Sequence, residues 1–373
     1  MTLHRRSLIA LPAAGLLAAC GPRPARSSTA PAGSLQRIVD ETGAPALGGM
    51  VVTADGTPFL EVAGLRRKDG GDRVTVQDRW HLGSNTKAMT AALYGKLVED
   101  GQAEWGATLG ALFPDLTLDP AWASTPIEAV MSHRAGLSDK GLIGIPWLIA
   151  AQGDKRPLTE QRTALVAKAL AAPPNGKPGV FEYGNLNFVV AGAAIERLTG
   201  GDWETAITER LFKPLGMTGA GFGAPKGDQP WGHRSLPFGV GGLKAVDPAG
   251  PADNPAALGP AGTVHMPLDD YARFLRLFLT GGGDYLKPET LARLTTPAPG
   301  ADYALGWGVA TGKPWARGPR LGHEGSNTMW HAMAVVAPAR GVALVSVSNA
   351  YPSGPVRAGS ILVDQLQARF APA

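Results

Sequence analysis

Short apolar runs typical of β-strands lie near both ends of this chain. Gly48–Thr53 and Phe59–Leu65 are separated by Asp55-Gly56, a strong hairpin signal. Near the other end, His331–Ala337 and Val342–Asn349 are joined by a short hinge of proline and glycine. Strands at both ends with helical patterns between them predict an α+β fold, in which one antiparallel sheet is built from both ends of the chain.

The segment between these strands is predicted to be mostly helical. We expect an inserted helical subdomain over roughly 105–280 and a final helix, Val356–Phe370, beside the sheet. Candidate helices within or next to the insertion are Thr159–Ala171, Leu186–Thr199, Trp203–Leu211 and Pro267–Leu279. Residues 34–373 show no internal repeat and no second linker, so we expect one continuous domain.

Residues 1–20 have the composition of an export signal. Arg5 and Arg6 precede a short apolar run that ends in Leu17-Ala18-Ala19-Cys20, which resembles a bacterial lipobox whose cysteine is lipidated. Cys20 is the only cysteine of the chain, which excludes an intrachain disulfide. The arginine pair also resembles a twin-arginine signal, so the export route stays open. Residues 21–33 are typical of an extended tether. We expect a lipoprotein on the periplasmic face of a bacterial membrane.

The basic character of the chain belongs to its first residues. Residues 1–33 carry four of the 35 basic side chains and no acidic one, which leaves 31 basic and 31 acidic side chains in residues 34–373. A folded part without net charge gives no electrostatic reason to expect nucleic-acid binding. We expect a monomer that contacts the membrane only through its N-terminal lipid.

Ser84 and Lys87 stand at the predicted start of a helix that continues to Asp100 with Met89, Leu93 and Leu97 on one face. The spacing places the lysine one turn above the serine. A serine hydroxyl is a weak nucleophile until a base takes its proton, and a lysine is such a base only when it is neutral. Burial and the positive end of the helix dipole both lower a lysine pKa. In isolation, the same pattern also fits a capping serine and a solvated lysine.

Two later motifs give this pair a context. Tyr183-Gly184-Asn185 precedes a predicted helix, and His323-Glu324-Gly325-Ser326 lies just before the predicted C-terminal hairpin. In this order, Ser84-x-x-Lys87, Tyr183-x-Asn185 and His323-x-Gly325 resemble the three signatures of the serine β-lactamase and penicillin-binding protein superfamily. The chain is most similar to its class C-like branch, which also contains D,D-peptidases, D-amino-acid peptidases and short-chain carboxylesterases. The likeness extends over roughly residues 34–371.

The resemblance implies a role for each motif residue. Ser84 would attack a carbonyl and form an acyl-enzyme, with Lys87 and Tyr183 as general base and acid in a division that the sequence leaves open. The backbone N–H groups of Ser84 and Ser326 would form the oxyanion hole, each worth on the order of 3 kcal/mol. Asn185 would orient Lys87 and the substrate, and His323 and Gly325 would line the substrate site.

The third motif departs from most β-lactamases, which carry lysine where His323 stands. Glu324 replaces a small or hydroxyl residue, and a carboxylate there would repel an anionic β-lactam by roughly 1–4 kcal/mol at contact distance. We therefore expect esters, amides or cationic peptides to be better substrates than penicillins and cephalosporins.

No cofactor or metal is expected. His4, His81, His233, His265 and His331 show no ligand spacing with acidic residues, and His133 is expected to be buried and to shape its loop.

Two other functional classes remain as alternatives. An α/β-hydrolase would need a Gly-x-Ser-x-Gly pentapeptide, which the chain lacks. A catalytically silent envelope lipoprotein that binds peptidoglycan peptide or lipid is compatible with the leader, although all three motifs hold chemically competent residues. The physiological substrate is not determined by the sequence.

Overall fold

The computed structural model describes residues 33–235, 242–352 and 354–372. The expected signal peptide, the lipidation site Cys20 and nearly all of the tether, residues 21–32, lie outside the described residues. No helix of the described part is long and apolar enough to cross a membrane.

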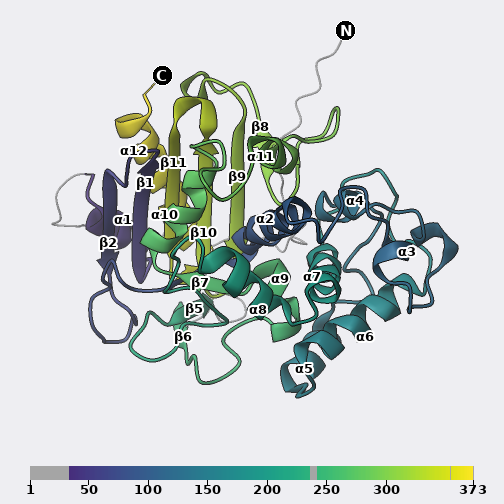
Figure 1. Ribbon diagram of the computed structural model, residues 1–373. Helices are drawn as coiled ribbons and strands as arrows, with labels where there is room; N and C mark the ends of the chain where they lie inside the picture. Colours follow the sequence, from purple (N-terminus) through teal and green to yellow (C-terminus); the bar gives the residue numbers. More distant parts are fainter. Residues whose placement is uncertain (1–32, 236–241, 353, 373) are drawn as a thin grey trace, which may run out of the picture.

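The centre of the fold is a six-stranded antiparallel sheet (Figure 1). Its order is β2-β1-β11-β10-β9-β8, so two strands from the start of the chain lie beside four from the end. The bounds are β1 Ala46–Thr53, β2 Phe59–Gly64, β8 Gly308–Ala310, β9 Arg320–Ser326, β10 His331–Ala337 and β11 Val342–Ser348. In the pair β1 and β11, which joins the two ends of the chain, Gly48 faces Val347 and Thr53 faces Val342. The predicted α+β fold with a sheet from both ends is confirmed.

His323 lies just before the hairpin of β10 and β11, as predicted, but the segment that carries it is itself a strand, which the sequence did not indicate. His323 belongs to β9 and faces Ala334 of β10 across the ladder. The sequence of β9, Arg-Leu-Gly-His-Glu-Gly-Ser, contains two glycines and little β-branched or aromatic character, so its local preference for a strand is weak. The strand forms despite this weak preference because β8 and β10 pair with it on its two sides.

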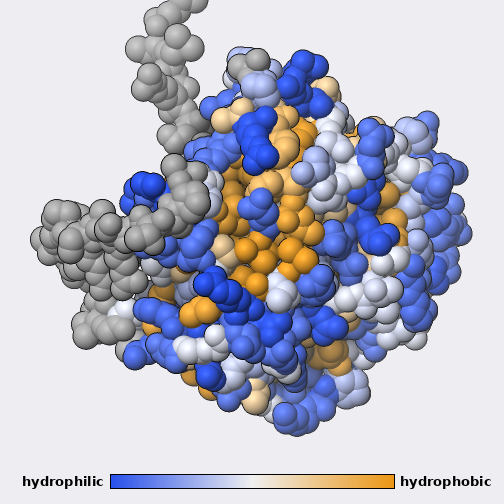
Figure 2. All heavy atoms as spheres, turned by 90° about the vertical axis from the view of Figure 1, so that its left-hand side faces the viewer, coloured by the Kyte–Doolittle hydropathy of each residue, from blue (hydrophilic) through white to orange (hydrophobic). Residues whose placement is uncertain are grey.

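Helices cover both faces of the sheet (Figure 1). On one face, α1 (Leu35–Thr42) and α12 (Gly354–Phe370) pack over β1 and β11, with Leu47, Leu344 and Leu362 in the buried layer. On the other face, α10 (Leu268–Leu277) lies against β1. Figure 2 shows apolar side chains gathered in the middle of the molecular face that carries β2 in Figure 1.

The helix that follows Ser84 lies between the sheet and a group of helices that Figure 1 shows on its right. This helix, α2 (Thr86–Glu99), buries Met89, Leu93 and Leu97 as predicted, but Ala91 and Tyr94 on its other sides are also fully buried. It is therefore a central helix and not an amphipathic surface helix. The helical group comprises α3 Leu109–Leu112, α4 Ile127–Met131, α5 Ile145–Gly153, α6 Leu158–Leu170, α7 Asn185–Thr199 and α8 Trp203–Ile207, which a π-helical turn, Thr208–Phe212, extends.

Short elements connect the helical group to the sheet. One small sheet has the order β3-β7-β4 and another the order β12-β5-β6. Their bounds are β3 Trp80–His81, β4 Gly221–Phe222, β5 Gly232–Ser235, β6 Leu243–Val246, β7 Val264–Met266 and β12 Ala350–Tyr351, and the short helices α9 and α11 span Gly259–Gly262 and Pro288–Thr295. Because β3 ends at His81, the first small sheet fixes the approach of the chain to Ser84.

Candidate active site

Ser84 lies in a single 3-10 turn, Gly83–Asn85, directly before α2. Gly83 has a φ of +52°, and a Cβ at this position would clash with the backbone N of Ser326. A Cβ at Gly325 would likewise meet the carbonyl of Leu82 and the backbone N of Ser84. Only glycine at these two positions allows such close approach of the two backbones. As a result, the two backbone segments that carry the amide groups of Ser84 and Ser326, which the family resemblance suggested as oxyanion donors, lie in close contact.

Lys87 is fully buried, and its Nζ has three polar neighbours. It lies 2.9 Å from Ser84 Oγ, 2.9 Å from Asn185 Oδ1 and 2.7 Å from the carbonyl oxygen of Ala261. Asn185 Oδ1 and the Ala261 carbonyl only accept hydrogen bonds, so they take both N–H groups of a neutral amine. The remaining lone pair of Nζ is then directed at the Ser84 hydroxyl, which is the arrangement a base requires.

Burial also sets the protonation of this lysine. Removal from water lowers the pKa of Lys87 to about 7, against a smaller raising effect of the Asp139 carboxylate. A large fraction of the side chain is therefore neutral near pH 7. Ala261 was not expected at the site, because a backbone carbonyl leaves no mark in a sequence.

Asn185 is positioned by a residue from another segment. It is the first residue of α7, and Gly184 before it has no side chain to cap the helix. The carboxylate of Asp139 does so instead, accepting hydrogen bonds from the backbone N–H of Asn185 at 2.9 Å and of Leu186 at 2.8 Å. Capping by a carboxylate is favourable at a helix N-terminus. Asp139 therefore fixes the start of the helix that carries Asn185.

Tyr183 completes the group around Ser84. Its side chain lies close enough to that of Ser84 to interact with it, and Lys87 Nζ lies 4.9 Å from the centre of its ring. Burial raises the pKa of Tyr183 above its ordinary value, so the phenol stays protonated at neutral pH. Of the two candidates for the base, Lys87 is thus the group that titrates near neutrality, and Tyr183 is the group that stays protonated.

His323 is buried and has protein partners at both ring nitrogens. Nδ1 lies 2.8 Å from the carbonyl oxygen of Glu324, which requires a proton on Nδ1, and Nε2 lies 2.9 Å from the hydroxyl of Tyr303. Burial and the nearby Lys87 lower the pKa of His323 to about 4. This neutral ring accepts the Tyr303 O–H and forms part of the wall around Tyr183. Tyr303 was missed in the sequence, because it belongs to none of the three motifs.

The argument that Glu324 repels an anionic substrate is wrong. Side chains alternate along a strand, so Glu324 projects to the opposite face of β9 from His323 and Gly325. It is exposed, and its carboxylate lies 3.6 Å from Nε2 of His331. Glu324 also faces Met333, which belongs to the apolar layer under α1 and α12. Its charge is therefore on the far side of the sheet from Ser84.

His133 has the structural role expected from the sequence. It is 1% exposed, its ring centre lies 4.5 Å from that of Tyr183, and its Nδ1 accepts a hydrogen bond from the backbone N–H of Gly184. Burial keeps the pKa of His133 well below its ordinary value. His133 is thus a neutral packing partner of Tyr183.

The other histidines form no metal site that the structure shows. In residues 33–235, 242–352 and 354–372, no group of three or more His, Cys, Asp or Glu side chains is placed to hold a metal ion. His81 does have an acidic partner, Asp253, which is 172 residues away in the sequence and could not be recognised from spacing.

Comparison with known proteins agrees with this geometry. The sequence pattern of the β-lactamase family matches residues 35–368. Penicillin-binding protein 4 of Amycolatopsis lactamdurans is 25% identical over 80% of this chain and 80% of its own length. Unguisins hydrolase ungD' of Aspergillus campestris is 26% identical, and the match covers 74% of this chain. It covers only 53% of the length of that relative.

A D-stereospecific amidohydrolase from Streptomyces sp. has the same fold. Its crystal structure superposes with a TM-score of 0.70 at 22% identity, covering 91% of this chain and 98% of its own. The family match, extending over nearly all described residues, and the shared fold lead to one conclusion. The chain belongs to the β-lactamase family.

Proposed function

We propose that this protein is a serine hydrolase that cleaves an ester or amide through an acyl-enzyme on Ser84. The observation that carries the proposal is the surroundings of Lys87 Nζ, in which two acceptors hold both N–H groups and leave the lone pair facing Ser84 Oγ. Lys87 takes the serine proton as Oγ attacks the carbonyl carbon. The backbone N–H groups of Ser84 and Ser326 stabilise the oxyanion that forms.

Breakdown of the tetrahedral intermediate needs a proton on the leaving group. Tyr183 is suited to deliver it, because its raised pKa keeps the phenol protonated and its side chain lies beside Ser84. Lys87 then returns its proton to Tyr183. In the second half of the reaction, a water takes the place of the leaving group and the same groups act in reverse.

The preferred substrates follow from the charge of the site. His323 is neutral and has both ring nitrogens engaged, so the third motif offers no cation to a substrate carboxylate. We infer that short-chain esters and D-amino-acid amides or peptides are better substrates than penicillins and cephalosporins. This preference now rests on His323 and not on Glu324.

A panel of substrates tests the proposal. Purified protein lacking residues 1–33 is assayed with 4-nitrophenyl acetate and butyrate, D-alanine and D-phenylalanine amides, and a chromogenic cephalosporin, beside Ser84→Ala. The expected result is turnover of at least one ester or amide, slower turnover of the cephalosporin and none by the variant. A faster cephalosporin rate would overturn the substrate preference. No turnover and no covalent labelling of Ser84 would favour a silent envelope protein that binds peptidoglycan peptide or lipid.

We also propose that the protein is exported and held at the periplasmic face of a membrane by a lipid on Cys20. The support is the sequence of residues 1–33 alone. Fractionation of cells carrying the full chain and Cys20→Ala tests it: the wild type should sediment with membranes and the variant should be soluble. Equal distribution of the two would contradict the proposal.

A further inference from the structure

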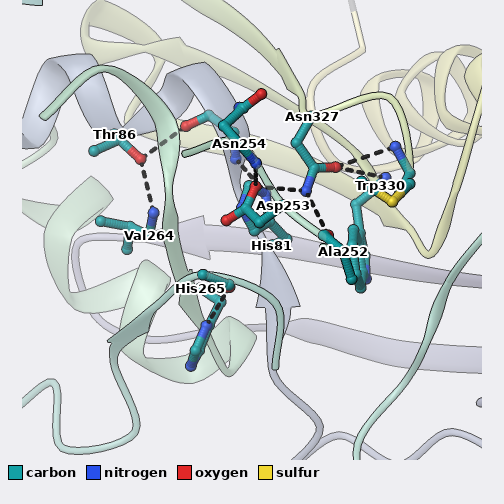
Figure 3. A network of polar contacts seen from close by, with 12 residues as sticks. His81, Thr86, Ala252, Asp253, Asn254, Val264, His265, Asn327 and Trp330 are labelled. Atoms are coloured by element: carbon teal, nitrogen blue, oxygen red, sulfur yellow. Dashed lines mark hydrogen bonds and ion pairs between the residues drawn. The ribbon is translucent and has the colours of Figure 1, made fainter. Parts of the chain in front are cut away.

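Figure 3 shows a polar network around Asp253 that includes His81 and Asn327. The network also reaches Gly83, the residue before Ser84. The backbone N–H of Gly83 donates to Nδ1 of His81 at 3.1 Å, and Nε2 of the same ring lies 2.8 Å from Oδ2 of Asp253. Because Nδ1 accepts, the proton of the neutral ring is on Nε2 and is donated to the carboxylate. His81 therefore transmits the position of Asp253 to the 3-10 turn that holds Ser84.

The second oxygen of the Asp253 carboxylate is hydrogen-bonded to the residue next to Ser326, whose backbone N–H is the other proposed oxyanion donor. Asp253 Oδ1 accepts from Nδ2 of Asn327 at 2.7 Å and from the backbone N–H of Asn254, also at 2.7 Å. Asn327 directly follows Ser326. Its Oδ1 accepts the backbone N–H groups of Met329 and Trp330, each at 3.1 Å, which fixes the turn between β9 and β10.

Burial makes this network rigid. His81 is 1% exposed and Asn327 is 3% exposed, and the side chain of Asp253 is 8% exposed. The ring of Trp330 stacks on that of His81 with centres 5.6 Å apart (Figure 3). Away from water, a carboxylate that accepts three directed hydrogen bonds has little freedom to move. Its position relative to both turns is therefore fixed.

We propose that Asp253, through His81 and Asn327, is the positioning residue of the oxyanion hole. One arm ends at Gly83, next to Ser84, and the other at Asn327, next to Ser326, so a single carboxylate sets the separation of the two N–H donors. The proposal rests on the proposed function, because an oxyanion hole has a purpose only in acyl transfer. Its effect is on transition-state stabilisation and not on substrate binding.

The chain offers a matched control for this network. His265 faces His81 across the pair β3 and β7, is buried, and uses Nδ1 to contact the carbonyl oxygen of Gly223 at 2.8 Å. It has no hydrogen bond to Gly83, Asp253 or Asn327 among those of the described residues. His265→Asn therefore removes a buried histidine beside the network without breaking it.

The test measures catalysis per active site for Asp253→Asn, His81→Gln and His265→Asn. An amide at 253 cannot accept from both arms, and glutamine at 81 can reach Asp253 but loses the acceptor for Gly83. Active sites are counted with a fluorophosphonate, so unfolded protein does not enter the rates. The further readouts are kcat, KM and the inhibition constant of phenylboronic acid, which places an oxygen where the oxyanion forms.

Both network variants should lose about 10- to 100-fold in kcat with KM changed less than about threefold, and phenylboronic acid should bind more weakly by a similar factor. His265→Asn should keep the wild-type kcat and inhibition constant per labelled site, whatever its thermal stability. Wild-type kcat and boronate affinity in Asp253→Asn would overturn the positioning role alone. If the wild type itself is not labelled at Ser84, the proposed function fails and the positioning role with it.

Discussion

The Nζ atom of Lys87 lies 2.9 Å from Oγ of Ser84, and its other two polar neighbours can only accept hydrogen bonds. When Lys87 is neutral, it accepts the serine proton; when it is charged, its third N–H donates to Oγ. The proton can thus move between the two side chains without rearrangement of either. We therefore expect the activity of the site to depend on the charge of this single lysine.

The first prediction concerns pH. Because burial lowers the pKa of Lys87 to about 7, the base is neutral above that pH and charged below it. The value of kcat/KM should rise about tenfold per pH unit below pH ~6.5 and level off above pH ~7.5. Hydrolysis of 4-nitrophenyl acetate between pH 5 and 9, corrected for the spontaneous rate, measures this. A flat or falling profile across pH 7 would contradict the role of Lys87.

The second prediction concerns stability. The unfolded chain binds the lysine proton up to pH about 10.5, whereas the folded protein releases it near pH 7, so the burial of Lys87 destabilises the fold most at and below pH 7. Lys87→Met removes this cost but also loses the hydrogen bonds of Nζ, and the net effect should raise the free energy of unfolding by about 2 kcal/mol at pH 6. This gain in stability should shrink toward pH 10.

Urea denaturation at pH 6 and pH 9 measures this gain. Lys96→Met is the control, because Lys96 lies in the same helix but pairs with Asp100 at the surface. Its effect should be small and nearly independent of pH. If Lys87→Met is less stable than wild type at pH 6, the contacts of the lysine stabilise the fold by more than its burial destabilises it, which contradicts the prediction.

The third prediction concerns the proton donor. Tyr183→Phe keeps the ring that packs on His133 and removes only the hydroxyl. We expect kcat to fall about 10²- to 10⁴-fold with little change in thermal stability. Tyr94→Phe serves as the control, since its hydroxyl donates to the carbonyl of Glu104 away from Ser84. A loss below about threefold in Tyr183→Phe would assign proton transfer to Lys87 alone.

The fourth prediction concerns Glu324. Because this side chain projects from the face of β9 opposite Gly325, Glu324→Gln should leave kcat/KM for both a neutral ester and an anionic cephalosporin within about twofold of wild type. The two substrates are measured in parallel at low and high salt. A selective gain on the cephalosporin would restore the charge-repulsion argument that the strand geometry removes.

Much of the fold was predictable because it depends on local pattern. The runs at Gly48–Thr53 and His331–Ala337 are short, apolar and followed by turn residues, and the helix before Gly200 is rich in apolar residues. Strand β9 was missed because its Gly325 serves close packing against Leu82 and Ser84, which conflicts with strand preference. Burial on all sides of α2 also depends on neighbours that periodicity does not reveal.

The part of the candidate site that consists of motif residues was predictable from the sequence. Ser84, Lys87, Tyr183 and Asn185 are brought together as the motifs implied, because side chains at the start of two helices converge there. Asp139, Tyr303 and Asp253 contact residues of the site or next to it from distant segments and follow no spacing rule, so only the folded structure shows these contacts. The error over Glu324 has the same origin, because the face of a side chain is undefined until its strand is recognised.

The most direct test of the account is the intact mass of the protein lacking residues 1–33 after incubation with a fluorophosphonate. Wild type, Ser84→Ala and Lys87→Met are compared at pH 8, and a penicillin is tried in parallel. We predict one adduct on the wild type, located at Ser84, none on Ser84→Ala, and labelling slowed by at least about 100-fold in Lys87→Met. An adduct on Ser84→Ala, or labelling of Lys87→Met at the wild-type rate, would contradict this prediction.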